Sequence, residues 1–256
     1  MKIVGIIPAR LQSTRLPRKL LLNATGKPLI QYVWETACEC PDLHDVVVAT
    51  DSEEIADVVH SFGGRVELTG HHHSGTDRIA EVTRRCFQDA DAVVNLQGDE
   101  PELEPQVVAA LVHQLRSTNC QMATVAAPIA TPEIVRDPSC VKVVTDVNGR
   151  AMYFSRSPIP FSRDIAIEDH FRDGEPSPWL LHVGLYAYRR DFLMKLTSLP
   201  PSPLEQLEKL EQLRALQSGA SIAVAVVNHA AAGIDTPEDY AAFVGRHALR
   251  LQRRVA

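Results

Sequence analysis

Short, continuously apolar runs alternate along the first half of the chain with longer segments whose apolar residues recur every three or four positions. Continuous runs that end at Gly or Pro are typical of strands buried on both faces of a parallel sheet. Such strands are expected at residues 3–7, 45–50, 92–96 and 122–127, and a short strand is expected at residues 65–68. Helical spacing begins near residues 28, 51, 76 and 104, between these runs. This order predicts an α/β fold with a doubly wound, mostly parallel central sheet.

The second half of the chain has a less regular pattern. Two strands joined by a turn are expected at residues 142–144 and 151–155, and residues 162–178 are polar and turn-rich, which indicates a mobile loop or an insertion. The alternation over residues 182–189 predicts a strand, and the leucine spacing over residues 201–214 predicts one amphipathic helix. A last strand at 221–227 and a closing helix at 240–254 complete the chain.

Length and composition limit the possible classes of protein. The 256 residues and the 45% hydrophobic content suit one domain over residues 1–256, with a lobe around residues 150–220. The net charge of −6 gives no reason to expect a nucleic acid as partner. No apolar run approaches the length of a membrane span, and the N-terminus lacks the pattern of a signal peptide. Five widely spread cysteines are typical of reduced thiols in the cytoplasm.

The stretch Ala92–Pro101 ends a buried strand in a cluster of polar residues. Asp99 and Glu100 come directly after the strand, and Gly98 allows the backbone to approach a ligand closely. In open α/β sheets ligands bind at the carboxyl edge of the strands. A carboxylate at that edge suits a hard cation such as Mg²⁺. The alternative is an acidic turn with no ligand.

Basic and hydroxyl side chains crowd the segment that follows the first strand. They are Arg10, Ser13, Thr14, Arg15 and Lys19. Cations and hydroxyl groups at the carboxyl edge of a strand form a cradle for polyphosphate. The alternative is a basic surface loop. The segment has neither a Walker A motif nor a glycine-rich dinucleotide fingerprint.

A second polar turn follows the strand at residues 65–68 and begins with His71, His72 and His73. Three adjacent histidines point in different directions, so chelation of one metal by all three is not expected. The residues that follow them can read the edge of a nucleobase or form an ordinary helix cap with a surface arginine. These residues are Ser74, Gly75, Thr76 and Arg78, with Gly75 or Thr76 as the expected cap.

Further candidates lie in the second half of the chain. Arg156, at a strand end, can bind a carboxylate through its guanidinium fork. His182 and Tyr186 share a strand face that suits a polyol, an exposed sheet face or a dimer surface. Glu211 falls inside the leucine stripe and, with Gln212, suits either hydroxyl binding or a structural ion pair. Asp235 precedes a helix that is already capped by Thr236 and Asp239, so its carboxylate is free to coordinate.

Three motifs together resemble the sugar-acid cytidylyltransferase family from about residue 3 to about residue 245. They are Pro8–Lys19 followed by Gly26-Lys27-Pro28, then Ser74–Arg78, then Gln97–Pro101. The likeness is greatest to the members that act on 3-deoxy-D-manno-octulosonate (KDO). Arg18 stands where this family usually has Gly before the lysine. In the members that act on acylneuraminates an Asn usually follows the lysine, whereas Leu20 stands here.

The resemblance implies a nucleotide-diphospho-sugar transferase-like fold whose lobe binds sugar and forms a homodimer. It implies transfer of CMP from CTP to the anomeric hydroxyl of KDO, with release of pyrophosphate, for lipopolysaccharide biosynthesis. Mg²⁺ is expected on Asp99 and Asp235, which with Arg10 and Lys19 form the catalytic set. The expected nucleotide-binding residues are Ala9, Arg10, Ser13, Thr14, Arg15, Lys19, Ser74, Gly75, Thr76, Arg78 and Gln97. The expected sugar-binding residues are Gln97, Arg156, His182, Tyr186, Glu211 and Gln212.

Two alternatives to this function remain at the level of sequence. One is a cytidylyltransferase for another sugar acid, such as an acylneuraminate or amino-KDO. The other is a non-catalytic nucleotide sensor that has kept the fold. A sensor is expected to have lost a metal carboxylate or the phosphate lysine, whereas Asp99, Asp235 and Lys19 are all present.

Overall fold

A computed structural model describes residues 1–172, 177–229 and 233–255. The chain forms two compact units. Unit 1 contains Met1–Gln106 and Ala231–Ala256, and unit 2 contains Val107–Ala230. The lobe expected around residues 150–220 falls inside unit 2. No helix in the described part of the chain is both long and apolar enough to cross a membrane.

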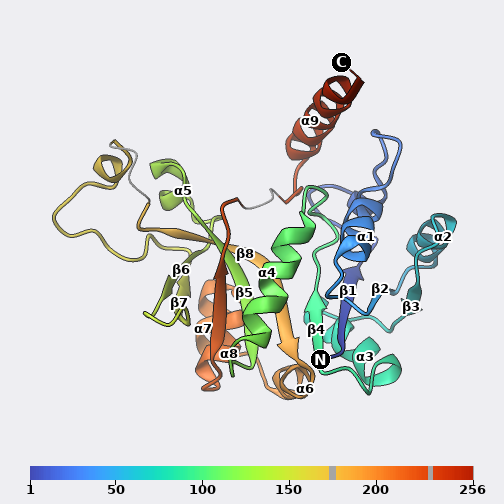
Figure 1. The fold of residues 1–256 in the computed structure, drawn as a ribbon, viewed down its shortest axis with the longest axis horizontal. Helices are drawn as coiled ribbons and strands as arrows, with labels where there is room; N and C mark the ends of the chain where they lie inside the picture. The colour runs from blue at the N-terminus through green and yellow to red at the C-terminus, as the bar shows by residue number, and fades with distance from the viewer. Residues whose placement is uncertain (173–176, 230–232, 256) are drawn as a thin grey trace. The chain divides into compact units, whose positions relative to one another are not determined.

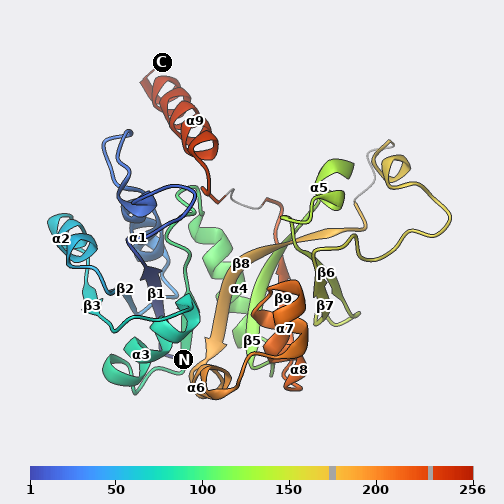
Figure 2. The same ribbon diagram turned by 180° about the vertical axis from the view of Figure 1, so that it is seen from behind.

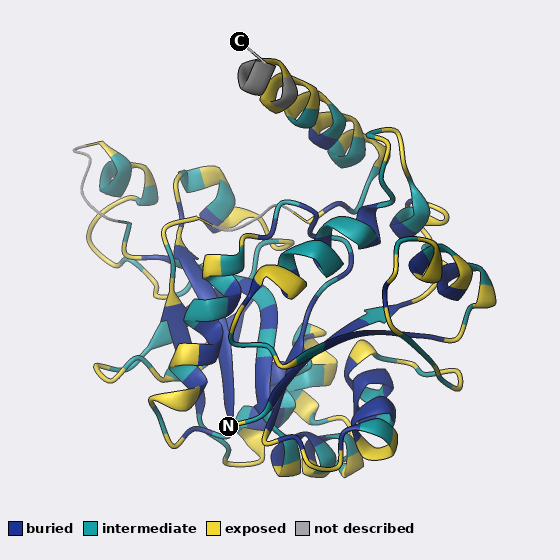
Figure 3. Cartoon of the chain, turned by 45° about the vertical axis from the view of Figure 1, so that its right-hand side comes forward, coloured by how far each residue is buried: buried dark blue, intermediate teal, exposed yellow. Residues whose placement is uncertain are grey.

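Unit 1 is built on parallel strands in the order β3-β2-β1-β4. The strands are β1 Ile3–Ala9, β2 Asp45–Thr50, β3 Val66–Leu68 and β4 Ala92–Asn95. Helices α1 Leu29–Glu39, α2 Glu53–Ser61 and α3 Gly75–Cys86 pack against them (Figure 1). Unit 1 also contains the 3-10 turn η1 Lys19–Leu21, which contacts α1, and the closing helix α9 Pro237–Val255. β1, β2 and β4 are almost entirely buried, as their continuous apolar runs predict (Figure 3).

Unit 2 pairs β5 Met122–Pro128 with β9 Ile222–Val226 in parallel and with β8 Leu180–Arg189 in antiparallel orientation. The hairpin of β6 Lys142–Thr145 and β7 Ala151–Ser155 joins β8 through β6 (Figure 2). The remaining elements are α4 Pro105–Arg116, which begins in unit 1, α5 Pro132–Arg136, η2 Ile167–Phe171, α6 Arg190–Ser198, α7 Pro203–Glu208 and α8 Gln212–Gln217. The predicted α/β class with a mostly parallel sheet is confirmed. The segment 162–178 contains η2, and its residues 173–176 lie outside the described part.

The prediction of a single helix over residues 201–214 is wrong, because the structure has two short helices there. Helix α7 ends at Glu208, because Lys209 adopts the left-handed conformation with φ 55°, and α8 begins only at Gln212. The break rotates Leu207 into solvent, where it is 80% exposed, while Leu213 is fully buried. The stripe of leucines that the helical period predicts is therefore not one face of one helix.

Helix α9 is tied to the loop that follows β4. Arg246 and Arg250 both bind Glu102, at 2.6 Å and 2.9 Å. Phe243 packs in a buried apolar cluster with Leu16 and Leu29. These contacts fix the start of α9, and hence Asp235, against the carboxyl edge of the parallel strands.

Arg18 has a left-handed backbone, with φ 55° and ψ 29°, at the residue before η1. This conformation costs a residue with a side chain about 1–2 kcal/mol, whereas Gly adopts it freely. The ion pair of Arg18 with Glu54 is solvent-exposed and contributes little. After allowance for the greater freedom of Gly in the unfolded chain, Arg18→Gly is expected to raise the free energy of unfolding by about 0.5–1 kcal/mol.

Urea unfolding of three proteins checks this prediction. Arg18→Ala removes the ion pair but keeps the strained backbone, so this control is expected to be no more stable than the unaltered chain. If Arg18→Gly and Arg18→Ala have the same stability, the backbone at this position is not strained.

Candidate active site

A pocket of about 310 Å³ lies at the carboxyl edge of the strands of unit 1. Three segments that are far apart in the sequence line it: the loop after β1, the turn that opens α3, and the loop after β4. Asp235 completes it from the segment that precedes α9. The pocket brings together most of the residues predicted for nucleotide and metal binding: Ala9, Arg10, Ser13, Thr14, Arg15, Lys19, Ser74, Gly75, Arg78, Gln97, Asp99 and Asp235. Thr76 is buried in the first turn of α3 and is not among the lining residues.

The ammonium group of Lys19 joins the two predicted metal carboxylates. Its Nζ lies 2.5 Å from Asp99 Oδ2 and 3.0 Å from Asp235 Oδ1. Arg15 binds the other oxygen of Asp235 at 2.9 Å. The side chains of Lys19 and Asp99 are 11% and 28% exposed, so the charge-assisted bond between them is largely shielded from water, whereas the pair of Arg15 and Asp235 is solvent-exposed. Cations and carboxylates thus alternate across the floor of the pocket.

Backbone contacts hold the two carboxylates close together. The Ile234 N–H donates to the Asp99 carbonyl at 2.9 Å, which ties the segment before α9 to the loop after β4. Gly98 leaves little room for a side chain, since a Cβ there would lie 3.3 Å from Leu20 Cδ2 and 3.4 Å from Ile7 Cγ2. The Gly therefore allows the loop that carries Asp99 to pack directly on β1 and η1.

The helix cap beside Asp235 is as the sequence predicts. Asp239 accepts hydrogen bonds from the N–H groups of Asp235 and Thr236, at 3.0 Å and 2.9 Å. Thr236 Oγ1 accepts one from the N–H of Asp239 at 3.2 Å. The Asp235 side chain takes no part in this cap. It is therefore directed to Lys19 and Arg15.

Glu100 differs sharply from its neighbour Asp99. Its side chain is buried, and one carboxyl oxygen, Oε2, has no hydrogen-bond partner among the described residues. Burial, together with the charge of Asp99, raises the pKa of Glu100 to about 8. At neutral pH Glu100 is therefore a neutral acid, and Asp99 supplies the negative charge of the pair.

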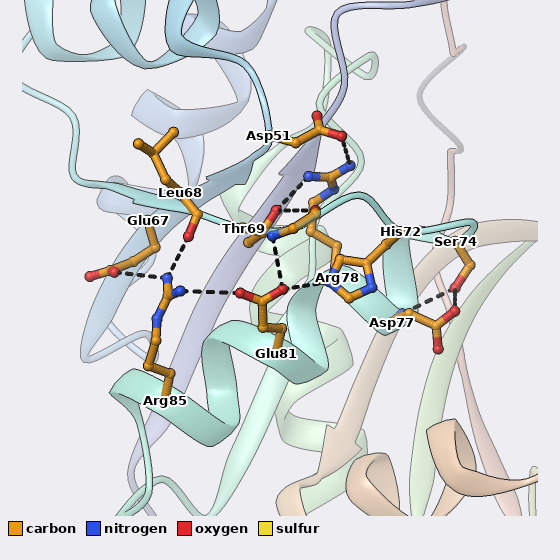
Figure 4. A network of polar contacts seen from close by, with 11 residues as sticks. Asp51, Glu67, Leu68, Thr69, His72, Ser74, Asp77, Arg78, Glu81 and Arg85 are labelled. Carbon is orange, nitrogen blue, oxygen red and sulfur yellow. Dashed lines mark hydrogen bonds and ion pairs between the residues drawn. The ribbon is translucent and has the colours of Figure 1, made fainter.

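The cap of α3 differs by one residue from the prediction. Ser74 caps α3, with its Oγ accepting from the Asp77 N–H at 3.0 Å, so Gly75 and Thr76 are helical. Ser52 caps α2, so the carboxylate of Asp51 before it is not needed for that cap. Asp51 instead binds the buried guanidinium of Arg78 at 3.0 Å, and Arg78 also donates to Thr69 Oγ1 at 2.5 Å (Figure 4). Arg78 lines the pocket, yet these bonds also tie it to the ends of β2 and β3.

The carboxylate pair is compatible in its chemistry with the binding of Mg²⁺. Both groups bond to one ammonium, so two of their oxygens lie close together and face the pocket. In the described part of the chain no group of three or more His, Cys, Asp or Glu residues is placed to hold a metal. Mg²⁺ commonly binds one or two carboxylates and takes its other oxygens from phosphate and water. Two carboxylates in a pocket rich in phosphate-binding cations fit that pattern.

Arg156 in unit 2 is held by backbone carbonyls. Its Nε donates to the Glu208 carbonyl at 2.8 Å, and Nη1 donates to the Pro138 carbonyl at 2.9 Å. The Glu208 carboxylate accepts from Ser155 Oγ and from the Arg156 N–H. The fully buried Lys142 donates to the Arg156 carbonyl at 2.6 Å. Both ends of this arginine are therefore fixed.

His182 is a neutral imidazole whose tautomer is set by Thr124. Burial lowers its pKa to about 3. Thr124 Oγ1 donates to the Leu185 carbonyl at 2.8 Å and lies 3.0 Å from His182 Nε2. Because a hydroxyl has one hydrogen, we assign the ring hydrogen to Nε2, which leaves Nδ1 as an acceptor. The ring of Tyr186 lies 5.4 Å from that of His182, as expected for residues on one strand face.

Gln212 is buried at the start of α8. Its Nε2 has no hydrogen-bond partner among the described residues. A buried amide nitrogen of this kind is costly unless a ligand or water satisfies it. Glu211, the residue before it, is the N-cap of α8.

The sequence of this chain matches a known protein family over most of its length. Residues 4–222 match the family model described as Cytidylyltransferase. The chain belongs to the cytidylyltransferase family. Two of its relatives are both named 3-deoxy-manno-octulosonate cytidylyltransferase. The protein of Syntrophotalea carbinolica is 47% identical over 93% of this chain and 96% of its own length. The protein of Syntrophobacter fumaroxidans is 48% identical over 95% of this chain and 96% of its own length.

Solved structures agree with this membership. A CMP:2-keto-3-deoxy-manno-octonic acid synthetase complexed with CTP has a TM-score of 0.87 and 41% identity, over 99% of this chain and all of that one. A cytidylyltransferase from Leptospira borgpetersenii has a TM-score of 0.59 and 18% identity, over 94% of this chain and 84% of that one, which shows a shared fold. The expected nucleotidyltransferase-like fold is thus confirmed.

Several residues of this cytidylyltransferase site were not predicted from sequence. His72, His73 and Gln12 line the pocket, although only the proximity of the histidines to Ser74 gave any signal. Lys142 and Glu208, which fix Arg156, gave none, because a lysine in a strand and a glutamate on a helix are ordinary surface residues.

Proposed function

We propose that this cytidylyltransferase transfers CMP from CTP to the anomeric hydroxyl of KDO and releases pyrophosphate and CMP-KDO, an activated sugar for lipopolysaccharide biosynthesis. The observation that carries the proposal is the pocket in which Lys19 lies between Asp99 and Asp235. It occurs in a chain whose relatives at 47% and 48% identity are named for this activity. The similar structure that contains CTP supports the choice of nucleotide.

The cations of the pocket suit a triphosphate. Phosphoryl transfer requires mainly positioning and neutralisation of charge. Arg10, Arg15 and Lys19 line one wall, and of these Lys19 and Arg15 already bind carboxylates at distances of 2.5–3.0 Å. Phosphate oxygens can replace those carboxylate oxygens as partners without a change in the chemistry of the bond. The three cations would then hold the β and γ phosphates as the leaving group.

Mg²⁺ would be held by Asp99 and Asp235. When bound there, it would withdraw charge from the phosphate oxygens and from the attacking oxygen. Gly98 and the bond from the Ile234 N–H to the Asp99 carbonyl keep the carboxylates together before any ligand arrives. A preorganised pair of this kind spends little free energy on rearrangement during the reaction.

The reaction itself is an in-line displacement at the α-phosphorus. The anomeric oxygen forms a bond to that phosphorus and gives its proton to solvent water, while the bond from the α-phosphorus to the bridging oxygen of pyrophosphate breaks and pyrophosphate leaves with that electron pair. Ser74, Gly75 and Gln97 line the pocket and would orient the base and ribose. Because Glu100 is largely protonated at neutral pH, it adds little negative charge that would repel the triphosphate.

The residues that we propose for binding the sugar acid, apart from Gln97, all lie in unit 2. The guanidinium of Arg156 would bind the carboxylate of KDO, since its orientation is fixed by Glu208 and Pro138. His182 Nδ1 and the unpartnered Gln212 Nε2 offer one acceptor and one donor to hydroxyl groups. Tyr186 and Glu211 would complete the set.

We also infer that the enzyme is a cytoplasmic homodimer. All five cysteines are free thiols, as is typical of a reducing compartment. Unit 2 exposes several large apolar side chains that a second copy would cover: Val147, Met152, Phe161 and Leu207. Sedimentation equilibrium would give the mass of a dimer, and the mass of a monomer would contradict the inference.

Pyrophosphate release tests the proposed function. The purified protein is given CTP and Mg²⁺ with either KDO or N-acetylneuraminate in separate reactions. Release with KDO alone is expected. Release only with N-acetylneuraminate would keep the reaction and overturn the assignment of the sugar. Release with neither would contradict the proposed function.

A further inference from the structure

The loop Thr69–Ser74 joins β3 to α3 and forms one wall of the pocket. His72, His73 and Ser74 line the pocket from this loop. The loop has no regular hydrogen-bonding ladder of its own beyond the bond from the Thr69 N–H to the Thr50 carbonyl. Its conformation therefore depends on side chains that reach it from other elements.

One such side chain is Glu81, which lies on α3 and is not among the residues that line the pocket. Its Oε2 accepts from the Gly70 N–H at 3.1 Å and lies 2.6 Å from His72 Nε2. Its Oε1 accepts from Arg85 at 3.1 Å. The hydrogen bonds from His72 and from the Gly70 N–H, together with the charge of Arg85, lower the pKa of Glu81, so it is a carboxylate at neutral pH. Figure 4 shows this one carboxylate joined to two residues of the loop.

We propose that Glu81 is a positioning residue for the nucleotide: it fixes loop Thr69–Ser74 through Gly70 and directs the ring of His72 into the pocket wall. The inference rests on the proposed function, because it assumes that the pocket binds CTP. Since Nε2 is engaged by Glu81, Nδ1 is the ring nitrogen of His72 that remains for a ligand. The same loop ends at Ser74, which caps α3 and contributes to the pocket.

The direction in which CTP affinity changes when Glu81 is replaced distinguishes a positioning role from a purely electrostatic one. A carboxylate near a triphosphate repels it, so removal of that charge would strengthen binding if charge alone mattered. Loss of the positioning contacts predicts the opposite result. Glu81→Ala is therefore expected to weaken CTP binding about tenfold. The value of kcat at saturating CTP is expected to stay within about twofold, because no group that contacts the reacting atoms is altered.

Glu67 offers a matched control. It belongs to the same polar network through Arg85, and its side chain is 23% exposed, against 26% for Glu81. Among the described residues, the Glu67 carboxylate accepts hydrogen bonds from Arg65 and Arg85, neither of which belongs to loop Thr69–Ser74 (Figure 4). Glu67→Ala removes the same charge from the same neighbourhood and is expected to leave the Kd for CTP within about twofold.

Titration calorimetry of each folded variant with CTP, ATP, GTP and UTP tests the proposal. The expected result is a Kd for CTP that rises about tenfold in Glu81→Ala and in His72→Ala. In the double variant the rise is expected to be smaller than the product of the two single effects, because both changes break the contact between Glu81 and His72. Glu81→Gln, which keeps an acceptor for the Gly70 N–H and is more conservative for folding, is expected to recover part of the loss.

The outcomes distinguish the two hypotheses. If the unaltered protein binds CTP and Glu81→Ala and Glu81→Gln bind it as well or better, the positioning role is overturned and the proposed function stands. An equal loss in Glu67→Ala also overturns it, since the effect would then come from the network as a whole. If the unaltered protein binds none of the four nucleotides, the proposed function fails, and the inference fails with it.

Discussion

Replacement of Asp99 or Asp235 by Asn is expected to lower turnover about a thousandfold or more while CTP still binds measurably. The change is nearly isosteric, so the packing on Gly98 and the bond from the Ile234 N–H to the Asp99 carbonyl should persist. Each substitution removes a carboxylate charge that pairs with Lys19 and that would hold Mg²⁺. An amide oxygen is a much weaker ligand for a hard cation than a carboxylate oxygen. Steady-state rates of pyrophosphate release, together with calorimetric binding of CTP, measure both parts of the prediction.

Glu100→Gln is the matched control for Asp99→Asn. It makes the same chemical change at the next residue, but Glu100 is already largely neutral at pH 7, because its pKa is raised to about 8. Its turnover at pH 7 is therefore expected to stay within about threefold of the unaltered protein. Near-normal turnover in both aspartate variants would remove the account of catalysis by these carboxylates.

Lys19→Met is expected to reduce kcat/KM about a hundredfold or more, the second largest effect. Lys19 is mostly buried and is the only described partner that bonds to both Asp99 and Asp235. Without its charge, the two carboxylates repel each other and the triphosphate loses a cation. Lys19→Arg keeps the charge but not the compact ammonium group, and it is expected to recover only part of the rate.

Thermal unfolding tests whether Lys19 neutralises the carboxylate pair, apart from any role in binding the triphosphate. In the unaltered protein its ammonium already neutralises the carboxylate pair, whereas in Lys19→Met a divalent cation must do so alone. Addition of Mg²⁺ without CTP is therefore expected to raise the Tm of Lys19→Met more than that of the unaltered protein. An equal shift of both Tm values would show that Lys19 does not compete for the carboxylate pair.

The apolar runs were a reliable guide to β1, β2 and β4 because each of these strands is almost entirely buried and is ended by a Gly, Pro or polar residue. The pocket followed from them, since polar residues placed after parallel strands must meet at one edge. Asp235 could be singled out as well, because Thr236 and Asp239 already account for the cap of α9. Here local chemistry and global fold agree.

Long-range contacts set the features that sequence patterns did not predict. The left-handed Lys209 breaks a helix that has no Gly or Pro at the break, so the leucine spacing gives no warning. The partners of Arg156 come from residues 138, 142 and 208, and local periodicity cannot pair such distant positions. Asp51 lies where a helix cap is expected from the sequence, but its carboxylate forms an ion pair with the buried guanidinium of Arg78.

The most direct test of the central claim follows the phosphorus atoms of CTP. The protein is incubated with Mg²⁺, KDO and CTP that carries a radioactive label either at the α-phosphate or at the γ-phosphate. The account predicts that the α label appears in a sugar conjugate and the γ label in pyrophosphate. Transfer of the γ label to the sugar, or no transfer of either label, would contradict it.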